Sequence, residues 1–97
     1  MTIRKSENGT ELILTLVGRL DTMTSKQLEG EMPSLVGKKS VILDFSQLEY
    51  VSSAGLRVLL VMQKTMNAQG GSLNLTGVRP EVNEIFDITG FSGFLTR

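Results

Sequence analysis

Two short apolar runs on either side of one long amphipathic stretch limit the folds open to this chain. Residues 40–45 (Ser-Val-Ile-Leu-Asp-Phe) and residues 72–76 are short runs with strand character. Between them, residues 54–68 place one stripe of side chains at helical spacing: Val58, Leu59, Met62, Thr65 and Met66. Gln69-Gly70-Gly71 ends that helix. A strand-helix-strand unit of this kind predicts a right-handed crossover between parallel strands.

A hairpin is expected before this unit. Asn8-Gly9 separates residues 3–7 from residues 11–18. Asn and Gly both tolerate the positive φ that a type I′ turn requires at its two central positions, so the sequence predicts such a turn at Asn8-Gly9. The second run is apolar on both faces, which is typical of a central strand.

A helix-start signal follows the hairpin. Thr24 and Gln27 have the spacing of a capping box, with Thr24 as the N-cap and Gln27 at the third helical position. The apolar positions that follow keep helical spacing: Leu28, Met32 and Leu35. Pro33 interrupts them and is expected to start a second short turn. We expect Met32, Met62 and Met66 to lie in the core rather than in an adaptable interface.

The last helix is predicted to start at Pro80, because proline suits the first helical position. Its apolar face is expected to hold Val82, Ile85, Phe86 and Ile88, and Gly90 closes it. Phe91, Phe94 and Leu95 form an apolar tail that is expected to pack on the core. The fold class is therefore α/β, in the order β-β-α-β-α-β-α, with a mixed four- to five-stranded sheet and helices mainly on one face.

Length and composition narrow the function. The chain has 97 residues, which predicts a single domain over residues 1–97, and its ten Lys and Arg balance ten Asp and Glu. This balance predicts no excess of positive charge of the kind that proteins use to bind nucleic acid. The absence of Cys and His removes thiolate sites, most zinc sites and every Ser-His-Asp triad, so we expect no enzyme, metal or cofactor. The polar N-terminus and the lack of a long apolar run indicate a cytoplasmic protein without membrane insertion.

The stretch Ser52-Ser53-Ala54-Gly55-Leu56 leaves a strand and enters a helix. The first N–H groups of a helix lack intrahelical partners, and the helix dipole is positive there. One interpretation is that Ser52 or Ser53 is only an N-cap. The other is that Ser53 carries a phosphate, which the helix start favours by roughly 0.3–1 kcal/mol when exposed and which adds a charge of about −2. The stretch matches no nucleotide-binding glycine pattern.

Asp21 occupies a similar place, between the end of the central strand and a helix start. A carboxylate there is favourable simply because it precedes a helix. If the two strands are parallel neighbours, however, the loops with Asp21 and Ser53 lie at one edge of the sheet. In open α/β sheets that edge is where binding sites gather.

In these residues and motifs the chain resembles the single-domain anti-sigma factor antagonists of the STAS (sulfate transporter and anti-sigma antagonist) domain family. The resemblance covers essentially the whole chain and rests on residues 16–21, 41–46 and, most specifically, 50–60. Gly70-Gly71 and the predicted helix over residues 80–90 also fit the family pattern.

The resemblance implies a partner-switching role. Family members bind an anti-sigma factor that is also a serine kinase with a histidine-kinase-like ATP-binding fold, and so free the sigma factor. Phosphorylation of one serine breaks the complex, and a metal-dependent Ser/Thr phosphatase restores it. The phosphoserine aligns with Ser53 and a partner-contacting aspartate with Asp21. The partner-binding set that it implies is Asp21, Thr22, Ser52, Ser53, Ala54, Gly55 and Arg57.

One departure from the family pattern leaves an alternative open. The residue before the phosphoserine is often Asp, whereas this chain has Ser52, which becomes a second candidate acceptor. Two other functions also stay open. One is a stand-alone STAS subunit of a membrane transporter, docking on an ATPase without phosphorylation, and the other is a small-ligand carrier. An acceptor serine at a helix start favours the antagonist.

Overall fold

The computed structural model of the protein describes residues 1–89, which form a mixed four-stranded sheet. Strands β1 (Thr2–Asn8), β2 (Glu11–Leu20), β3 (Ser40–Val51) and β4 (Ser72–Thr76) lie in that order across the sheet. β1 is antiparallel to β2, whereas β2 is parallel to β3 and β3 to β4. The predicted hairpin and the two parallel crossovers are confirmed.

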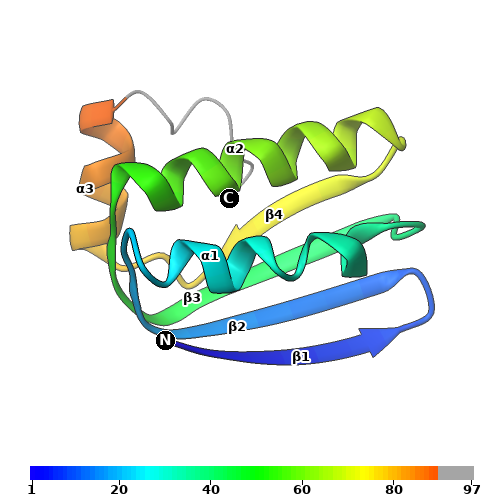
Figure 1. Ribbon diagram of the computed structural model, residues 1–97, viewed down its shortest axis with the longest axis horizontal. Coiled ribbons are helices and arrows are strands. Elements are labelled where there is room, and N and C mark those ends of the chain that lie inside the picture. The colour runs from blue at the N-terminus through cyan, green and yellow to red at the C-terminus, as the bar shows by residue number, and fades with distance from the viewer. Residues whose placement is uncertain (90–97) are drawn as a thin grey trace.

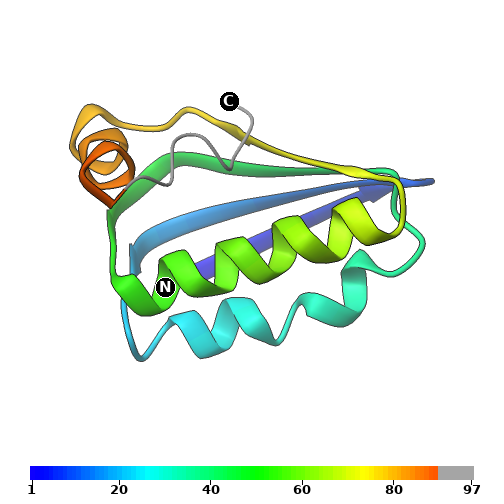
Figure 2. The ribbon, with the colours of Figure 1, turned by 90° about the horizontal axis from the view of Figure 1, so that it is seen from above.

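The helices lie mainly on one face, as the sequence predicts (Figures 1 and 2). α1 (Ser25–Glu29), a 3₁₀ helix η1 (Met32–Leu35) and α2 (Ser53–Ala68) cover the same side of the sheet. α3 (Pro80–Thr89) stands beside the junction of β3 and α2. Pro33 lies in the first turn of η1, so the predicted second short turn is also confirmed.

The core lies between this face of the sheet and α2. Alternate strand residues point into it and are at most 3% exposed: Leu12, Leu14, Leu16, Val41, Leu43, Phe45, Leu73 and Leu75. From α2, Met62 and Met66 are fully buried as expected, while Met32 is half-buried against the core. Burying a large apolar side chain contributes about 1.5–3 kcal/mol, so this stripe fixes α2 on the sheet.

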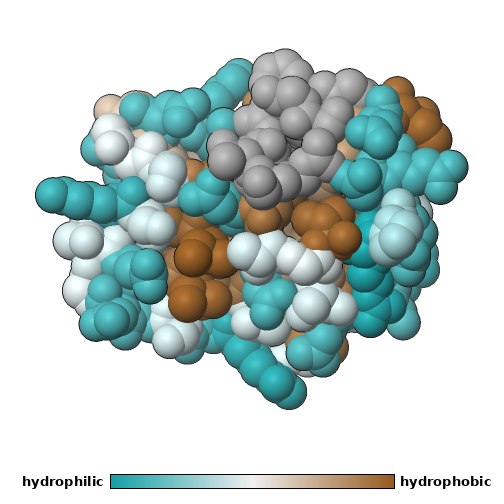
Figure 3. All heavy atoms as spheres, turned by 180° about the vertical axis from the view of Figure 1, so that it is seen from behind, coloured by the Kyte–Doolittle hydropathy of each residue, from teal (hydrophilic) through white to brown (hydrophobic). Residues whose placement is uncertain are grey.

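The opposite face of the sheet is more open. Ile13, Val17 and Ile42 alternate with the core residues of β2 and β3 and are half-buried there. Figure 3 shows apolar side chains gathered on this side among polar neighbours. Among residues 1–89 the apolar side chains that β2, β3 and β4 place on one face of the sheet are thus buried, whereas the apolar side chains on the other face are half-buried.

The hairpin turn differs from the prediction. Asn8 pairs with Glu11, so the two-residue loop is Gly9-Thr10 and not Asn8-Gly9. Gly9 has a φ of 63°, whereas Asn8 and Thr10 keep negative φ. The type I′ prediction is wrong: a glycine at the first central position is the pattern of a type II′ turn, which requires positive φ at that residue alone.

The end of α3 also needs a correction. Val82 and Phe86 are fully buried, and the rings of Phe45 and Phe86 lie 6.2 Å apart. Ile88, however, is 77% exposed, so it does not belong to the buried face that helical spacing predicted. The expected helix end at Gly90 and the apolar tail of Phe91, Phe94 and Leu95 lie outside the described residues.

Candidate functional site

The site lies at the edge where β2 and β3 end. β3 runs beyond the six residues predicted for it and continues to Val51, with register irregularities where it passes the second half of β2. Leu20 and Val51, the last residues of the two strands, are parallel partners. The Ser52 backbone N–H donates to the Leu20 carbonyl at 2.8 Å. This bond holds the two loops together at one edge, as the strand order predicts.

The two serines at the start of α2 have different environments. Ser52 is the N-cap, with φ −86° and ψ 172°, and its hydroxyl accepts from the Gly55 N–H at 3.2 Å. Ser53 is the first residue of the helix and is exposed. Within the described part of the chain the Ser53 hydroxyl makes no hydrogen bond. Ser52 therefore caps the helix, and Ser53 is free for another role.

Gly55 sits beneath the surface of the site. A Cβ atom at this position would lie 2.7 Å from Leu20 Cγ and 3.0 Å from the Leu20 carbonyl oxygen. The Leu20 side chain is fully buried, and the Leu20 carbonyl oxygen accepts from the Ser52 N–H. Neither Cγ nor the carbonyl oxygen can therefore move away from an added Cβ. Glycine is thus required for the first turn of α2 to rest on the end of β2. In this structure Gly55 is buried and supports the site through this close packing.

Asp21 and Thr24 form the cap of the turn before α1. Asp21 Oδ1 accepts from the backbone N–H groups of Met23 (3.0 Å) and Thr24 (2.9 Å). In return the Thr24 hydroxyl accepts from the Asp21 N–H at 2.8 Å, and it donates to the Arg19 carbonyl at 2.6 Å. This reciprocal pair has the pattern of a capping box.

The capping box predicted for Thr24 and Gln27 is therefore wrong, because the real box lies three residues earlier. Thr24 is the residue before α1 but has helical φ and ψ (−79° and −17°), and its side chain makes no cap hydrogen bond to α1. The Gln27 N–H donates to the Thr24 backbone carbonyl instead. The Asp-x-x-Thr spacing of Asp21 and Thr24 was the signal that could have located it.

The same contacts keep Asp21 ionised. Thr24 lowers the pKa of the Asp21 carboxyl, first through its backbone N–H and then through its hydroxyl, whose oxygen lies 3.0 Å from Oδ1 so that its one proton is shared with the Arg19 carbonyl; desolvation has a smaller opposing effect. Smaller contributions come from the Met23 N–H and from the charge of Arg19, whose guanidinium lies 4.4 Å from the centre of the Tyr50 ring. Asp21 is thus a negative charge at this edge, with Oδ1 engaged within its own turn.

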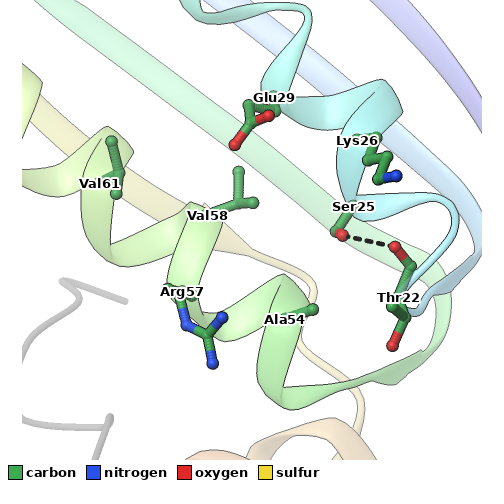
Figure 4. A pocket seen from close by; sticks show the side chains of 8 residues that line it. All are labelled: Thr22, Ser25, Lys26, Glu29, Ala54, Arg57, Val58 and Val61. Atoms are coloured by element: carbon green, nitrogen blue, oxygen red, sulfur yellow. Dashed lines mark hydrogen bonds between the residues drawn. The ribbon is translucent and has the colours of Figure 1, made fainter.

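A cleft of about 280 Å³ separates α1 from α2 beside these loops (Figure 4). Its walls come from both helices and from the turn before α1: Thr22, Ser25, Lys26, Glu29, Ala54, Arg57, Val58 and Val61. The Ser25 hydroxyl donates to the Thr22 carbonyl at 3.0 Å and closes the turn at one end. The structure thus brings Thr22, Ala54 and Arg57 of the predicted partner-binding set to one cleft.

Met23 was missed at the level of the sequence. Its side chain is 81% exposed, and nothing in the sequence predicted its position, since the methionines expected in the core are Met32, Met62 and Met66. Its backbone N–H is held by Asp21, so this apolar side chain projects from a fixed turn next to Thr22. Val61, 48% exposed on the rim of the cleft, was missed as well. A large apolar side chain held outward in this way is suited to contact another protein.

Two features are absent from the described residues. Across residues 1–89, no three acidic side chains gather closely enough to hold a metal ion. No helix in the same part of the chain is long and apolar enough to cross a membrane.

Comparison with known proteins decides the family. The family model described as "Mlab, STAS domain" matches residues 3–96. The chain belongs to the STAS-domain family. It is 42% identical over 82 residues to BtrV of Bordetella bronchiseptica, whose name places it among anti-sigma factor antagonists; the match covers 82% of this chain and 71% of that protein. The anti-sigma F factor antagonist of Paenibacillus polymyxa is 30% identical over 82 residues, covering 81% and 70%.

Solved structures show the same STAS fold. The phosphorylated form of SpoIIAA from Bacillus superposes with a TM-score of 0.77 at 17% identity, covering 98% of this chain and 89% of that one. A sulfate transporter family protein from Wolinella succinogenes gives a TM-score of 0.78 at 21% identity, covering 89% and 71%. At these identities the likeness concerns the fold alone, and the STAS fold is common to both classes of protein.

Proposed function

We propose that this STAS domain is an anti-sigma factor antagonist controlled by phosphorylation of Ser53. The observation that carries the proposal is that the two serines at the start of α2 have different environments. Ser52 caps α2, while Ser53 is exposed and its hydroxyl is unengaged within the described residues. The names of the relatives from Bordetella bronchiseptica and Paenibacillus polymyxa support the same reading.

A phosphate at Ser53 would change the surface without unfolding it. The first turn of a helix favours negative charge, and the Ser52 cap does not involve the Ser53 side chain. The added charge of about −2 stands at the edge that already carries Asp21. In a partner interface, like charge and desolvation together can cost several kcal/mol, and each 1.4 kcal/mol weakens binding about tenfold.

The surface that meets the partner is formed by the two loops and the cleft between their helices. Asp21 fixes the turn that presents Thr22 and Met23, and α2 presents Ala54 and Arg57. In this proposal the partner is an anti-sigma factor that is also a serine kinase with a histidine-kinase-like ATP-binding fold. A metal-dependent Ser/Thr phosphatase reverses the modification, the exchange takes place in the cytoplasm, and the STAS domain itself catalyses no step.

The transporter-subunit function has less support. The STAS fold occurs in the sulfate transporter family protein as well as in SpoIIAA, so the fold does not distinguish an antagonist from a transporter subunit. The choice rests on the curated relatives, which are named as antagonists, and on the exposed acceptor at the helix start.

Mapping of the phosphate tests the proposal. The protein is incubated with ATP and each candidate anti-sigma factor kinase of the same genome, and the products are analysed by intact mass and peptide sequencing. We expect one phosphate, on Ser53. The matched control is Ser52→Asp, which keeps a good N-cap but removes the second hydroxyl. This variant should accept the phosphate, and Ser53→Ala should not. A phosphate found only on Ser52 would contradict the proposal.

A further inference from the structure

Arg57 lies one helical turn after Ser53 on α2. Residues four apart on a helix are neighbours on its surface, and they are separated by about 6 Å along the axis. Both side chains are exposed. No ion pair or hydrogen bond engages the Arg57 guanidinium within residues 1–89, although the residue stands at the rim of the cleft. Arg57 is therefore an uncommitted cation beside the proposed acceptor.

The direction of the Arg57 side chain fits a partner at position 53. Side chains of a helix lean toward its N-terminus, so residue i+4 extends over residue i. In Figure 4 the Arg57 side chain extends toward the first turn of α2 rather than toward α1. An acidic group four residues before a basic one is also the more favourable order, since it agrees with the helix dipole.

We propose that Arg57 is the internal counter-charge of a phosphate on Ser53. This inference rests on the proposed function, because it deepens the regulation of the same site. The guanidinium has a planar fork of N–H donors that binds two phosphate oxygens at once, which an ammonium group does not. In the phosphorylated protein the Arg57 guanidinium, which already extends toward the first turn of α2 (Figure 4), binds the phosphate and is no longer available to a partner at the rim of the cleft. The switch thus adds negative charge and also withdraws a cation from the partner surface.

Other charges near the cleft have different positions. Lys26 and Glu29 belong to α1 and face α2 across the cleft, and Asp21 is bound within its own turn. Lys64, an exposed cation on α2 itself, lies 11 residues beyond Ser53, or about 16 Å along the helix axis. Lys64 thus provides a matched control for a general effect of positive charge on this helix.

The test uses full-length protein with phosphoserine encoded at position 53, so that no kinase is needed. Phosphorus NMR follows the second protonation of the phosphate in the parent, Arg57→Gln, Arg57→Lys and Lys64→Gln. We expect Arg57→Gln to raise the titration midpoint by about 0.3 pH, a twofold change in proton affinity typical of helix pairs four residues apart. Lys64→Gln should leave the midpoint unchanged, and Arg57→Lys should recover part of the difference. The Arg57 Nε–H resonance should shift with the same midpoint as the phosphate.

Two results would overturn the inference. One is an Arg57 Nε–H resonance that does not shift during the phosphate titration. The other is an equal change of the titration midpoint in Arg57→Gln and Lys64→Gln. Because the phosphate is encoded rather than transferred, these results do not depend on any kinase. Failure of a kinase to modify Ser53 would instead contradict the proposed function.

Discussion

Replacing Gly55 with alanine tests how the site is built. The new Cβ would approach Leu20 Cγ to 2.7 Å and both Leu20 Cδ2 and the Leu20 carbonyl oxygen to 3.0 Å. Overpacking of this kind costs about 1–3 kcal/mol. Alanine has a better helix propensity than glycine and offsets roughly 0.5–1 kcal/mol of that cost. We therefore expect Gly55→Ala to lower the free energy of unfolding by about 1–2 kcal/mol.

The assay is thermal and urea unfolding followed by circular dichroism. For a domain of this size the loss corresponds to a fall in Tm of about 5–10 °C. Gly30→Ala is the matched control, because its Cβ would come no closer than 3.3 Å to another atom and its backbone is already helical, with φ −63°. That variant should be as stable as the parent or slightly more so. Equal stability of Gly55→Ala and Gly30→Ala would refute the packing argument.

Three further predictions concern the two loops. Ser52→Ala should cost about 1 kcal/mol through loss of the cap, whereas Ser53→Ala should unfold within about 0.5 kcal/mol of the parent, as measured by urea titration. Asp21→Ala should lower the Tm at neutral pH. Folding lowers the pKa of this carboxyl, so its stabilisation of the fold is present above about pH 4 and fades as the pH falls further. The difference in Tm between variant and parent should therefore shrink in acid. Met23→Ser should leave the Tm unchanged, since the side chain is 81% exposed, yet weaken binding of the anti-sigma factor in calorimetry; unchanged affinity would exclude Met23 from the interface.

The sequence was sufficient for the order of elements because that order depends on local signals. Helical spacing over residues 54–68 and the two short apolar runs predicted α2 and its parallel neighbours, and β4 has the predicted bounds. The meeting of the Asp21 and Ser53 loops followed from the topology alone. Neither inference requires knowledge of how particular side chains pack.

The errors arose where two local solutions compete. Asn8-Gly9 suits a type I′ turn, but extending β1 by one residue allows a turn that needs only the positive φ of Gly9. Thr24 is a favourable N-cap residue, and Gln27 has the spacing of its partner in a capping box. In the structure, however, the Asp21 carboxylate accepts from the Thr24 backbone N–H, and the Thr24 hydroxyl accepts from the Asp21 backbone N–H. In each case the choice depends on strand register or on the path of the chain between elements, which short patterns do not specify.

The cleft could not be predicted for a related reason. Its lining depends on which sides of α1 and α2 face each other, and therefore on the relative placement of two helices that are distant in sequence. The exposure of Met23 depends on the cap formed by Asp21, which residue type alone does not reveal.

The central claim is that one phosphate on Ser53 controls binding of the anti-sigma factor. The most direct measurement is the Kd of that factor for the unmodified protein and for protein with phosphoserine encoded at position 53, in the same buffer. The added charge of about −2 at this edge predicts at least a tenfold weaker complex, with both forms equally well folded. Equal Kd values for the two forms would contradict the claim.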